Sequence, residues 1–347
     1  MLRAMDSAVA GLRAHQNKLD VIGNNIANVN TFGFKSQAYS FKDAMYQTSR
    51  TSSGGKTDTN GNGIIGGANP AQYGYGSLTG SIATDFTTST PTYVGGFNAA
   101  INGSGFFITS SSNKKVVLDP ADIRATTAVL KKSNFAYTRV GQFSVDANGY
   151  IVDANHNFVY GFQPDSLTEP TKYGDEGKDL VPLRAPELKA DGTVDLTPPS
   201  FANRAAQMKS IEIGEDGIIK GIIDLKTLGP PAQITATSIV LGKVGVASFQ
   251  NQEGLSKAGN NTFNAGVGDN TGYISATMPG EGSTSTLMAG YLEASNVDLA
   301  KEFSDMITTQ RGFQANTKII TVSDEVLQDL VNTVSYTHLT LPTIYSV

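Results

Sequence analysis

The sequence predicts an α+β fold in which paired long N- and C-terminal helices form a coiled-coil core and flank a β-rich middle domain of hairpins and meanders. Two patterns predict this fold. Apolar residues recur about every 3.5 residues at both ends of the chain, and alternation with period two, broken by tight turns, fills the middle. The composition agrees, because 37 of the 347 residues are Gly and only 16% are charged, which favours turn-rich β structure.

The N-terminal segment, residues 1–46, is predicted to hold one long helix and the turn that ends it. Its apolar residues follow the alternating three- and four-residue steps of a coiled-coil seam, with Gln16 and Gly23 as weak positions. Charged residues such as Arg13 and Asp20 lie off this seam. The seam residues are Leu2, Met5, Val9, Leu12, Leu19 and Ile26.

The C-terminal segment, residues 285–333, is predicted to hold a second long helix. Asn296 is the expected N-cap, and Asp298 places negative charge in the first turn. The seam of this helix, interrupted by Gln310 and Thr317, consists of Leu299, Phe303, Met306, Phe313, Ile320 and Leu327. Because no core segment lies near either helix in the sequence, we expect the two helices to pair. The alternative is two ordinary helices that pack on a globular core.

The middle domain, residues 81–284, is predicted to be β-rich. Asn148-Gly149 supplies the positive φ of a hairpin between strands at 143–145 and 150–152, and a third strand is expected at 158–160. A second hairpin is expected around Asp216-Gly217. An extended linker is predicted over 47–80, a small insert over 164–205 and a short helix over 120–132.

The residue inventory argues against catalysis, cofactors and metals. The chain has no Cys and only three His, so thiolate chemistry is excluded and a His-based site is not expected. Gly61 to Gly66 matches a dinucleotide-binding pattern, but no strand precedes it and no helix follows it. The net charge of −5 argues against a nucleic-acid partner, and no apolar segment is long enough for membrane insertion. The N-terminus also lacks the pattern of a cleavable signal peptide.

The most informative segment runs from Gly23 to Lys35. Four Asn within seven residues end a helix, because Asn is a poor helix former that bonds to nearby backbone and tolerates left-handed φ. Gly33 permits a sharp change of chain direction, and Phe34 anchors the chain that follows.

This segment resembles the signature shared by rod and hook proteins of the bacterial flagellum, and the resemblance extends over nearly the whole chain. The signature and assembly residues carried over are Asn24, Asn25, Ala27, Asn28, Asn30, Thr31, Gly33, Phe34 and Lys35. Three further motifs resemble the family's: Gly103-Ser104-Gly105-Phe106-Phe107, Tyr137-Thr138-Arg139-Val140-Gly141-Gln142-Phe143 and Leu292-Glu293-x-Ser295-Asn296. Residues 67–72 resemble a hook linker, with Ala68 in place of Thr.

The resemblance implies a structural subunit of the flagellar hook, without enzymatic activity, that self-assembles into a flexible hollow tube and transmits torque from rod to filament. The implied partners are other copies of the chain, the rod, the hook cap, the hook–filament junction proteins and the flagellar type III export apparatus. The implied location is the extracellular hook and basal body, reached without a cleavable signal peptide. A distal rod subunit is the alternative, and a secreted adhesin or enzyme is a third class that no cluster of carboxylates or His supports.

The last residues, 334–347, are predicted to be non-native. After Thr333 the seam pattern stops, and no charged residue follows Asp329. Val334 to Thr343 correspond to one reading frame of a transposon-type sequencing adapter, GTC TCT TAT ACA CAT CTG ACG CTG CCG ACG. A natural β-prone tail is the alternative, because Thr, Leu, Tyr and Val favour strands.

Overall fold

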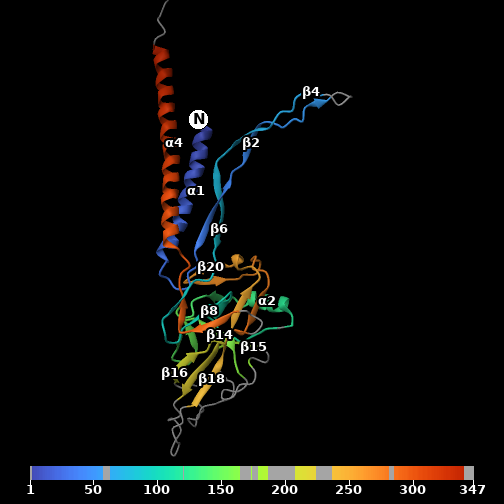
Figure 1. The fold of residues 1–347 in the computed structure, drawn as a ribbon, viewed down its shortest axis with the longest axis vertical. Helices are drawn as coiled ribbons and strands as arrows, with labels where there is room; N and C mark the ends of the chain where they lie inside the picture. The colour runs from blue at the N-terminus through green and yellow to red at the C-terminus, as the bar shows by residue number, and fades with distance from the viewer. Residues whose placement is uncertain are drawn as a thin grey trace, which may run out of the picture. The chain divides into compact units, whose positions relative to one another are not determined.

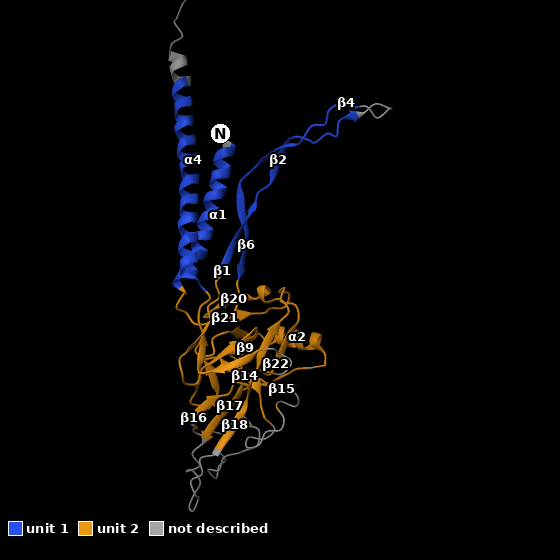
Figure 2. Ribbon diagram, viewed as in Figure 1, with its two compact units in different colours: residues 1–27, 37–84, 297–347 blue, residues 28–36, 85–296 orange. Residues whose placement is uncertain are grey.

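The computed structural model describes residues 2–57, 63–119, 121–164, 173, 179–186, 208–223, 237–280 and 285–339. The chain forms two compact units (Figure 2). Unit 1 comprises Met1–Ala27, Gln37–Thr84 and Val297–Val347, and unit 2 comprises Asn28–Ser36 and Asp85–Asn296. Most of the predicted insert at 164–205 and residues 340–347 of the predicted tail lie outside the described residues.

Two long helices dominate unit 1 (Figure 1). Helix α1 (Leu2–Ala27) packs along α4 (Leu299–Leu339). The pairs Gly11–Asn316 near one end and Asn25–Glu302 near the other show that the helices run antiparallel. Among the described residues, no helix is both long enough and apolar enough to span a membrane.

The residues that are buried in α1 and α4 are not those of the predicted seam. Six of them are small or polar, namely Ala8, Gly11, Ala14 and Asn25 of α1 and Thr309 and Ser323 of α4, and the other two are Val21 and Ile22 of α1. Val9, Leu299 and Phe303 of the predicted seam are exposed. Met5, Leu12, Leu19, Ile26, Met306, Phe313, Ile320 and Leu327 are half-buried, and the side chain of Leu2 is outside the described residues. Coiled-coil pairing through this seam therefore stays a prediction.

Glycines set the close approach of the two helices. A Cβ at Gly11 would lie 2.8 Å from Nδ2 of Asn316, and a Cβ at Gly312 would lie 2.7 Å from Cε1 of His15. His15, which the sequence places on a polar helix face, is instead half-buried in this contact, with its ring 5.2 Å from that of Phe41.

Unit 1 also contains a two-stranded antiparallel ribbon. Its strand pairs are β1 (Gln37–Asp43) with β6 (Ser77–Thr84), β2 (Tyr46–Arg50) with β5 (Ala71–Gly74), and β3 (Lys56–Thr57) with β4 (Gly63–Ile65). Polar side chains add cross-strand bonds, such as the one that Gln72 Nε2 donates to Thr48 Oγ1 at 3.1 Å. The residues predicted as an extended linker thus include paired strands.

Unit 2 is the β-rich middle of the chain. Its main sheet has the order β16-β17-β18-β14-β9-β11-β21-β20, and β8 pairs with β23 and β7 with β24 outside it. The strands are β7 (Pro91–Tyr93), β8 (Ala99–Asn102), β9 (Phe106–Ser110), β10 (Val116–Val117), β11 (Ala136–Thr138), β12 (Phe143–Val145), β13 (Ile151–Asp153), β14 (Phe158–Phe162), β15 (Asp179–Pro182), β16 (Met208–Ile213), β17 (Ile218–Ile223), β18 (Thr237–Val244), β19 (Val246–Phe249), β20 (Ser256–Gly259), β21 (Thr262–Asn264), β22 (Ile274–Thr277), β23 (Thr286–Ala289) and β24 (Tyr291–Glu293).

The local predictions for this unit are confirmed. Strands β12, β13 and β14 form the expected meander, and Gly149 in its first turn has φ +80°. Strands β16 and β17 form the second hairpin, with Gly217 at φ +76°. The short helix is α2 (Ile123–Lys132), which begins after Asp122 because that carboxylate accepts bonds from the N–H groups of Arg124 and Ala125.

Strand β9 divides the core of unit 2 into two clusters. Phe107 faces a cluster with Phe143, Ile151 and Leu287, whereas Phe106 faces one with Leu130, Phe263 and Ile274. This division follows from the two-residue period of a strand, which sends successive side chains to opposite faces of the sheet. Both faces of β9 are therefore covered.

Candidate functional site

The predicted signature segment begins in unit 1 with the last turn of α1. The Asn25 side chain is buried and binds both backbone polar atoms of Gln37, donating to its carbonyl at 2.9 Å and accepting from its N–H at 3.0 Å. Asn25 Nδ2 also donates to Oε1 of Glu302 on α4 at 3.1 Å. Burial raises the pKa of Glu302, and the bond from Asn25 opposes that shift. Asn25 thus joins α1, β1 and α4 within unit 1.

The second part of the signature, Asn28–Ser36, belongs to unit 2 and turns sharply at Gly33. Gly33 has φ +68°, and a Cβ there would lie 2.7 Å from Cγ2 of Val140, so both conformation and space require glycine. Its N–H donates to the carbonyl of Glu293 at 2.8 Å. The turn is therefore fixed by residues far away in the sequence.

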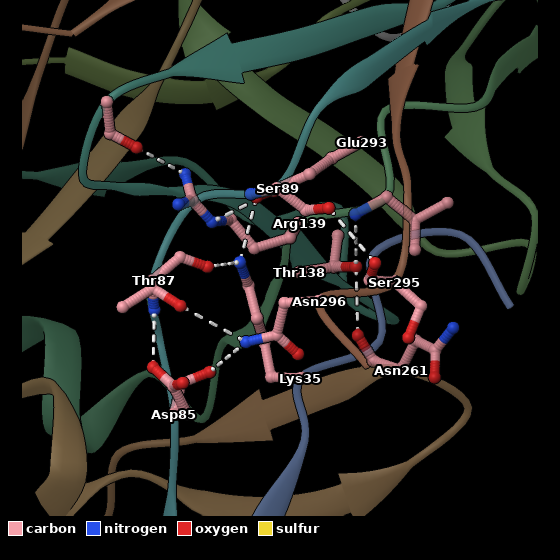
Figure 3. A network of polar contacts seen from close by, with 12 residues as sticks. Lys35, Asp85, Thr87, Ser89, Thr138, Arg139, Asn261, Glu293, Ser295 and Asn296 are labelled. Atoms are coloured by element: carbon pink, nitrogen blue, oxygen red, sulfur yellow. Dashed lines mark hydrogen bonds and ion pairs between the residues drawn. The ribbon is translucent and has the colours of Figure 1, made fainter. Parts of the chain in front are cut away.

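A buried ionic network follows the turn (Figure 3). Lys35 Nζ lies 2.8 Å from Oε1 of Glu293 and donates to the carbonyl of Thr87 at 2.7 Å. Arg139 Nε lies 3.3 Å from the other carboxylate oxygen of Glu293, and its Nη1 donates to the carbonyl of Gly103 at 2.8 Å. All three side chains are at most 2% exposed.

The buried side chains of the network are two cations and one anion. Burial lowers the pKa of Lys35 and Arg139 adds to that shift, whereas Glu293 and, more weakly, the exposed Asp85 oppose it. Burial likewise lowers the pKa of Arg139, again opposed by Glu293. The charge of Glu293 is therefore what keeps both cations buried, because an unpaired charge in such a place is costly.

Asn296 extends the network and does not cap the C-terminal helix as predicted. It accepts from the N–H of Ser36 at 2.7 Å. It also donates to the carbonyl of Asp85 at 2.9 Å (Figure 3). The helix is capped by Asp298, whose Oδ1 accepts from Ala300 N at 2.9 Å and Lys301 N at 3.3 Å. Asp298 is the better placed residue because a capping side chain bonds to backbone two and three positions ahead.

The hairpin of β20 and β21 holds the signature turn from another side. Lys257 Nζ donates to the carbonyl of Lys35 at 2.9 Å and lies 4.6 Å from the ring centre of Phe34. Asn261 Nδ2 donates to the carbonyl of Phe32 at 2.9 Å. The predicted anchoring role of Phe34 fits its burial in this contact.

Four segments that are distant in the sequence therefore meet at one place in unit 2. Lys35 comes from the signature, Gly103 from the Gly-Phe-Phe motif, Arg139 from the Tyr-Thr-Arg motif and Glu293 from the Leu-Glu motif. These motifs were recognised from the sequence, but Arg139, Glu293 and Asn296 were not predicted to share a site. A signal was present, because charged residues that stand next to strand-forming apolar residues are candidates for buried pairs.

The predicted signature residues divide by exposure. Asn25, Gly33, Phe34 and Lys35 are buried, Asn28 and Thr31 are half-buried, and Asn24, Ala27 and Asn30 are exposed. Thr31 Oγ1 donates to Oδ1 of Asn28 at 3.2 Å within the turn. Among the described residues, no group of three or more His, Asp or Glu side chains is arranged to hold a metal ion. The arrangement serves to fix the chain path.

Comparisons with known proteins show the family to which the chain belongs. The chain is 35% identical to the flagellar basal-body rod protein FlgG of Bacillus subtilis over 334 residues, which cover 96% of this chain and 99% of that protein. The chain belongs to the flagellar hook and rod protein family. It is also 29% identical to the rod protein FlgG of Caulobacter vibrioides, with 94% of this chain and 97% of that protein covered.

Hook proteins of the family are similar as well. The flagellar hook protein FlgE of Borreliella burgdorferi is 28% identical over 464 residues, with 95% of this chain and 99% of that protein covered. Three family models match: "Flagella basal body rod protein" at residues 5–35, "Flagellar hook protein FlgE/F/G D1 domain" at 128–221 and "Flagellar basal body rod FlgEFG protein C-terminal" at 288–333. Family members are structural proteins of the flagellar hook and basal body, and both the predicted hook function and the rod alternative fit.

Proposed function

We propose that this protein is the subunit of the distal rod, the alternative in the sequence prediction, and that it polymerises with itself in the flagellar basal body. The observation that carries the proposal is length. The alignments to FlgG proteins extend over 328 to 338 residues of this 347-residue chain and cover nearly all of each relative. The alignments to FlgE proteins extend over 464 and 488 residues, so those proteins contain more than 100 residues that this chain lacks.

Exposed apolar residues in unit 1 support self-polymerisation. Phe303 and Ile307 of α4 are 50% and 52% exposed, and Ile319, Val322, Val326 and Leu330 are also exposed. Large apolar side chains on a helix are normally covered. Helices of neighbouring copies would cover them, and the coiled-coil core predicted from the sequence belongs to this assembled state.

Complementation tests the proposal in the bacterium that carries this gene. A strain without the native gene should make basal bodies that lack both distal rod and hook, and the plasmid-borne gene should restore both in electron micrographs. A deletion strain that retains complete rods and lacks only the hook would contradict the rod assignment and favour the hook.

The hook remains the second candidate because of one feature of the ribbon. Residues 67–72, which resemble a hook linker, include Asn69 and Gln72, and Asn69 accepts a bond from Arg50 at 3.2 Å through its carbonyl. In either case the proposed location is the hook and basal body of the flagellum. The proposed partners are other copies, adjoining rod and hook components, the hook cap, the hook–filament junction proteins and the type III export apparatus, with no enzymatic role.

The proposal also treats residues 334–347 as non-native. The C-terminal family model ends at residue 333, which supports this reading. The backbone is helical as far as Leu339. Amplification of the locus from source DNA tests the claim, because a genomic product that encodes these fourteen residues would contradict it.

A further inference from the structure

A groove beside α2 in unit 2 combines apolar and basic side chains. It has a volume of about 610 Å³, and its lining includes the apolar Val267 and Tyr273 together with a basic rim of Arg124, Lys131 and Lys132. No carboxylate contributes to this lining. Val267 is 82% exposed, the highest value among the large apolar side chains described. Such a surface fits a small acidic element of another protein chain.

The rim charges are not neutralised within one copy. Among the described residues, none of the three cations has an ion pair, and Lys131 Nζ donates to the carbonyl of Asp269 at 3.3 Å. Arg124 and Lys132 are exposed, and Lys131 is half-buried. Three cations therefore remain available for an anionic partner.

The same chain exposes a matching acidic element at the turn between β16 and β17. Glu215 and Asp216 stand at its tip, and both are exposed. Gly214 and Gly217 flank them, and Gly217 is buried against Pro279, so the side chains of Glu215 and Asp216 are the parts of the turn that are open to a partner. Asp216 Oδ1 accepts from the N–H of Ile218 at 3.2 Å and so supports the turn, whereas Glu215 has no ion pair among the described residues.

The groove and the turn lie on different parts of unit 2. The turn packs on the core cluster that contains Ile213 and Leu287, and Leu287 N donates to the carbonyl of Glu215 at 3.0 Å. Helix α2 packs on the other cluster through Leu130. In Figure 2, α2 and the β16 hairpin lie at opposite margins of the unit. One copy therefore cannot fill its own groove.

We infer that the groove beside α2 binds the β16–β17 turn of a second copy, with Glu215 set against Lys132 and Arg124. Two different surfaces that meet in this way make a head-to-tail contact, and a repeated head-to-tail contact that does not close produces a helical polymer. The inference rests on the proposed self-polymerisation and names one contact that carries it. Because the chain is acidic overall, copies repel each other, and a local contact of opposite charges selects their orientation.

Cysteine cross-linking tests the contact directly, because the chain has no Cys of its own. Full-length Lys132→Cys and Glu215→Cys proteins are mixed under polymerising conditions and oxidised. We expect a disulfide-linked species that contains one copy of each variant. Lys114→Cys mixed with Glu215→Cys is the matched control, because Lys114 is an exposed lysine outside the groove. Cross-linking no greater than in this control, in a sample that does polymerise, would overturn the inference.

Charge exchange gives an independent readout. We expect Lys132→Glu or Glu215→Lys alone to slow polymer growth about tenfold at low salt, and the two changes together to restore growth. Equal growth rates of all four proteins, or a double variant slower than both single variants, would overturn the contact. If the unaltered chain does not polymerise at all, the proposed function fails first, so the two failures are distinguishable.

Discussion

Unit 2 has a large apolar core and pairs its buried charges, whereas the helices of unit 1 leave many large apolar side chains exposed. In unit 2, Phe106 and Phe107 are both fully buried on opposite faces of β9, and Glu293 pairs with two buried cations. In unit 1, the helices meet through Gly11 and Gly312, while Phe303 is half-exposed. The difference teaches that unit 2 is built to be stable in a single copy and that the helices of unit 1 depend on other copies for burial.

The largest expected effect is on unit 2. Glu293→Ala leaves Lys35 and Arg139 buried without their carboxylate, so we expect the free energy of unfolding to fall by about 3–5 kcal/mol. Urea unfolding followed by tyrosine fluorescence measures this, because the chain has no Trp. Lys115→Ala is the control. It removes an exposed ion pair with Asp179 and should cost at most about 1 kcal/mol. Equal losses in the two variants would show that the network contributes little.

A proline in α1 should disrupt the helix of unit 1 and leave the fold of unit 2 unchanged. Leu12→Pro removes a helical hydrogen bond and costs about 3 kcal/mol in the helix, so we expect polymerisation to be lost while unit 2 remains folded. Hydrogen exchange of the purified variant should show faster exchange in α1 and unchanged protection of β9 and β14. Polymer growth at the rate of the unaltered chain would contradict the role of the helices in assembly.

Acid should loosen the helix contact in unit 1. Burial, and then the charge of Lys18, lower the pKa of His15 from 6.5. The folded state therefore binds fewer protons than the unfolded state, and the contribution of His15 is present above pH 6.5 and is lost as pH falls through its lowered pKa. The charged groups that the structure places nearby are Lys18, which contacts the Phe41 ring, and Asp305 of α4, 3.9 Å from Lys18.

Hydrogen exchange in α1 between pH 7 and pH 5, corrected for intrinsic rates, measures this effect. His15→Gln should remove most of the pH dependence. His156→Asn is the matched control, because Asn also accepts the positive φ of 62° at that position. If the exchange rate in α1 still depends on pH in His15→Gln, groups other than His15 cause that dependence.

The smallest effect on the single chain should come from Phe303→Ser. An exposed side chain contributes little to folding, so we expect a change within about 0.5 kcal/mol in the free energy of unfolding. Polymer growth should nevertheless fall, because the same side chain would be covered by a neighbouring copy. If the change does not affect polymer growth, Phe303 does not lie in the interface between copies. The exposure of this side chain would then be no evidence that unit 1 depends on other copies.

Local features of the fold could be predicted from the sequence, and contacts between distant segments could not. The turn at Asn148-Gly149 is specified by local residues, because Gly149 takes a positive φ and Asp146 Oδ1 accepts from the N–H groups of Asn148 and Tyr150, so the first hairpin was predictable. The helix interface could not be predicted, because the seam was identified from large apolar side chains, whereas the two helices approach each other most closely at Gly11 and Gly312. Asn296 was misassigned as a cap because its partners Ser36 and Asp85 come from other parts of the chain. Neighbouring apolar residues mark Glu293 as a candidate for burial, but they do not identify Lys35 as its partner.

The ion pair between Lys35 and Glu293 also constrains the order in which the protein folds. Its two residues are 258 positions apart. Closing so long a loop costs entropy that only later contacts repay, so such pairs form late. The N–H of Gly33 donates to the carbonyl of the same residue, Glu293, so the turn at Gly33 also cannot be fixed before β24 is in place. In a chain that is synthesised from the N-terminus, the signature turn therefore cannot take its final conformation until almost the whole polypeptide is available. Only a nearly complete copy presents the folded turn.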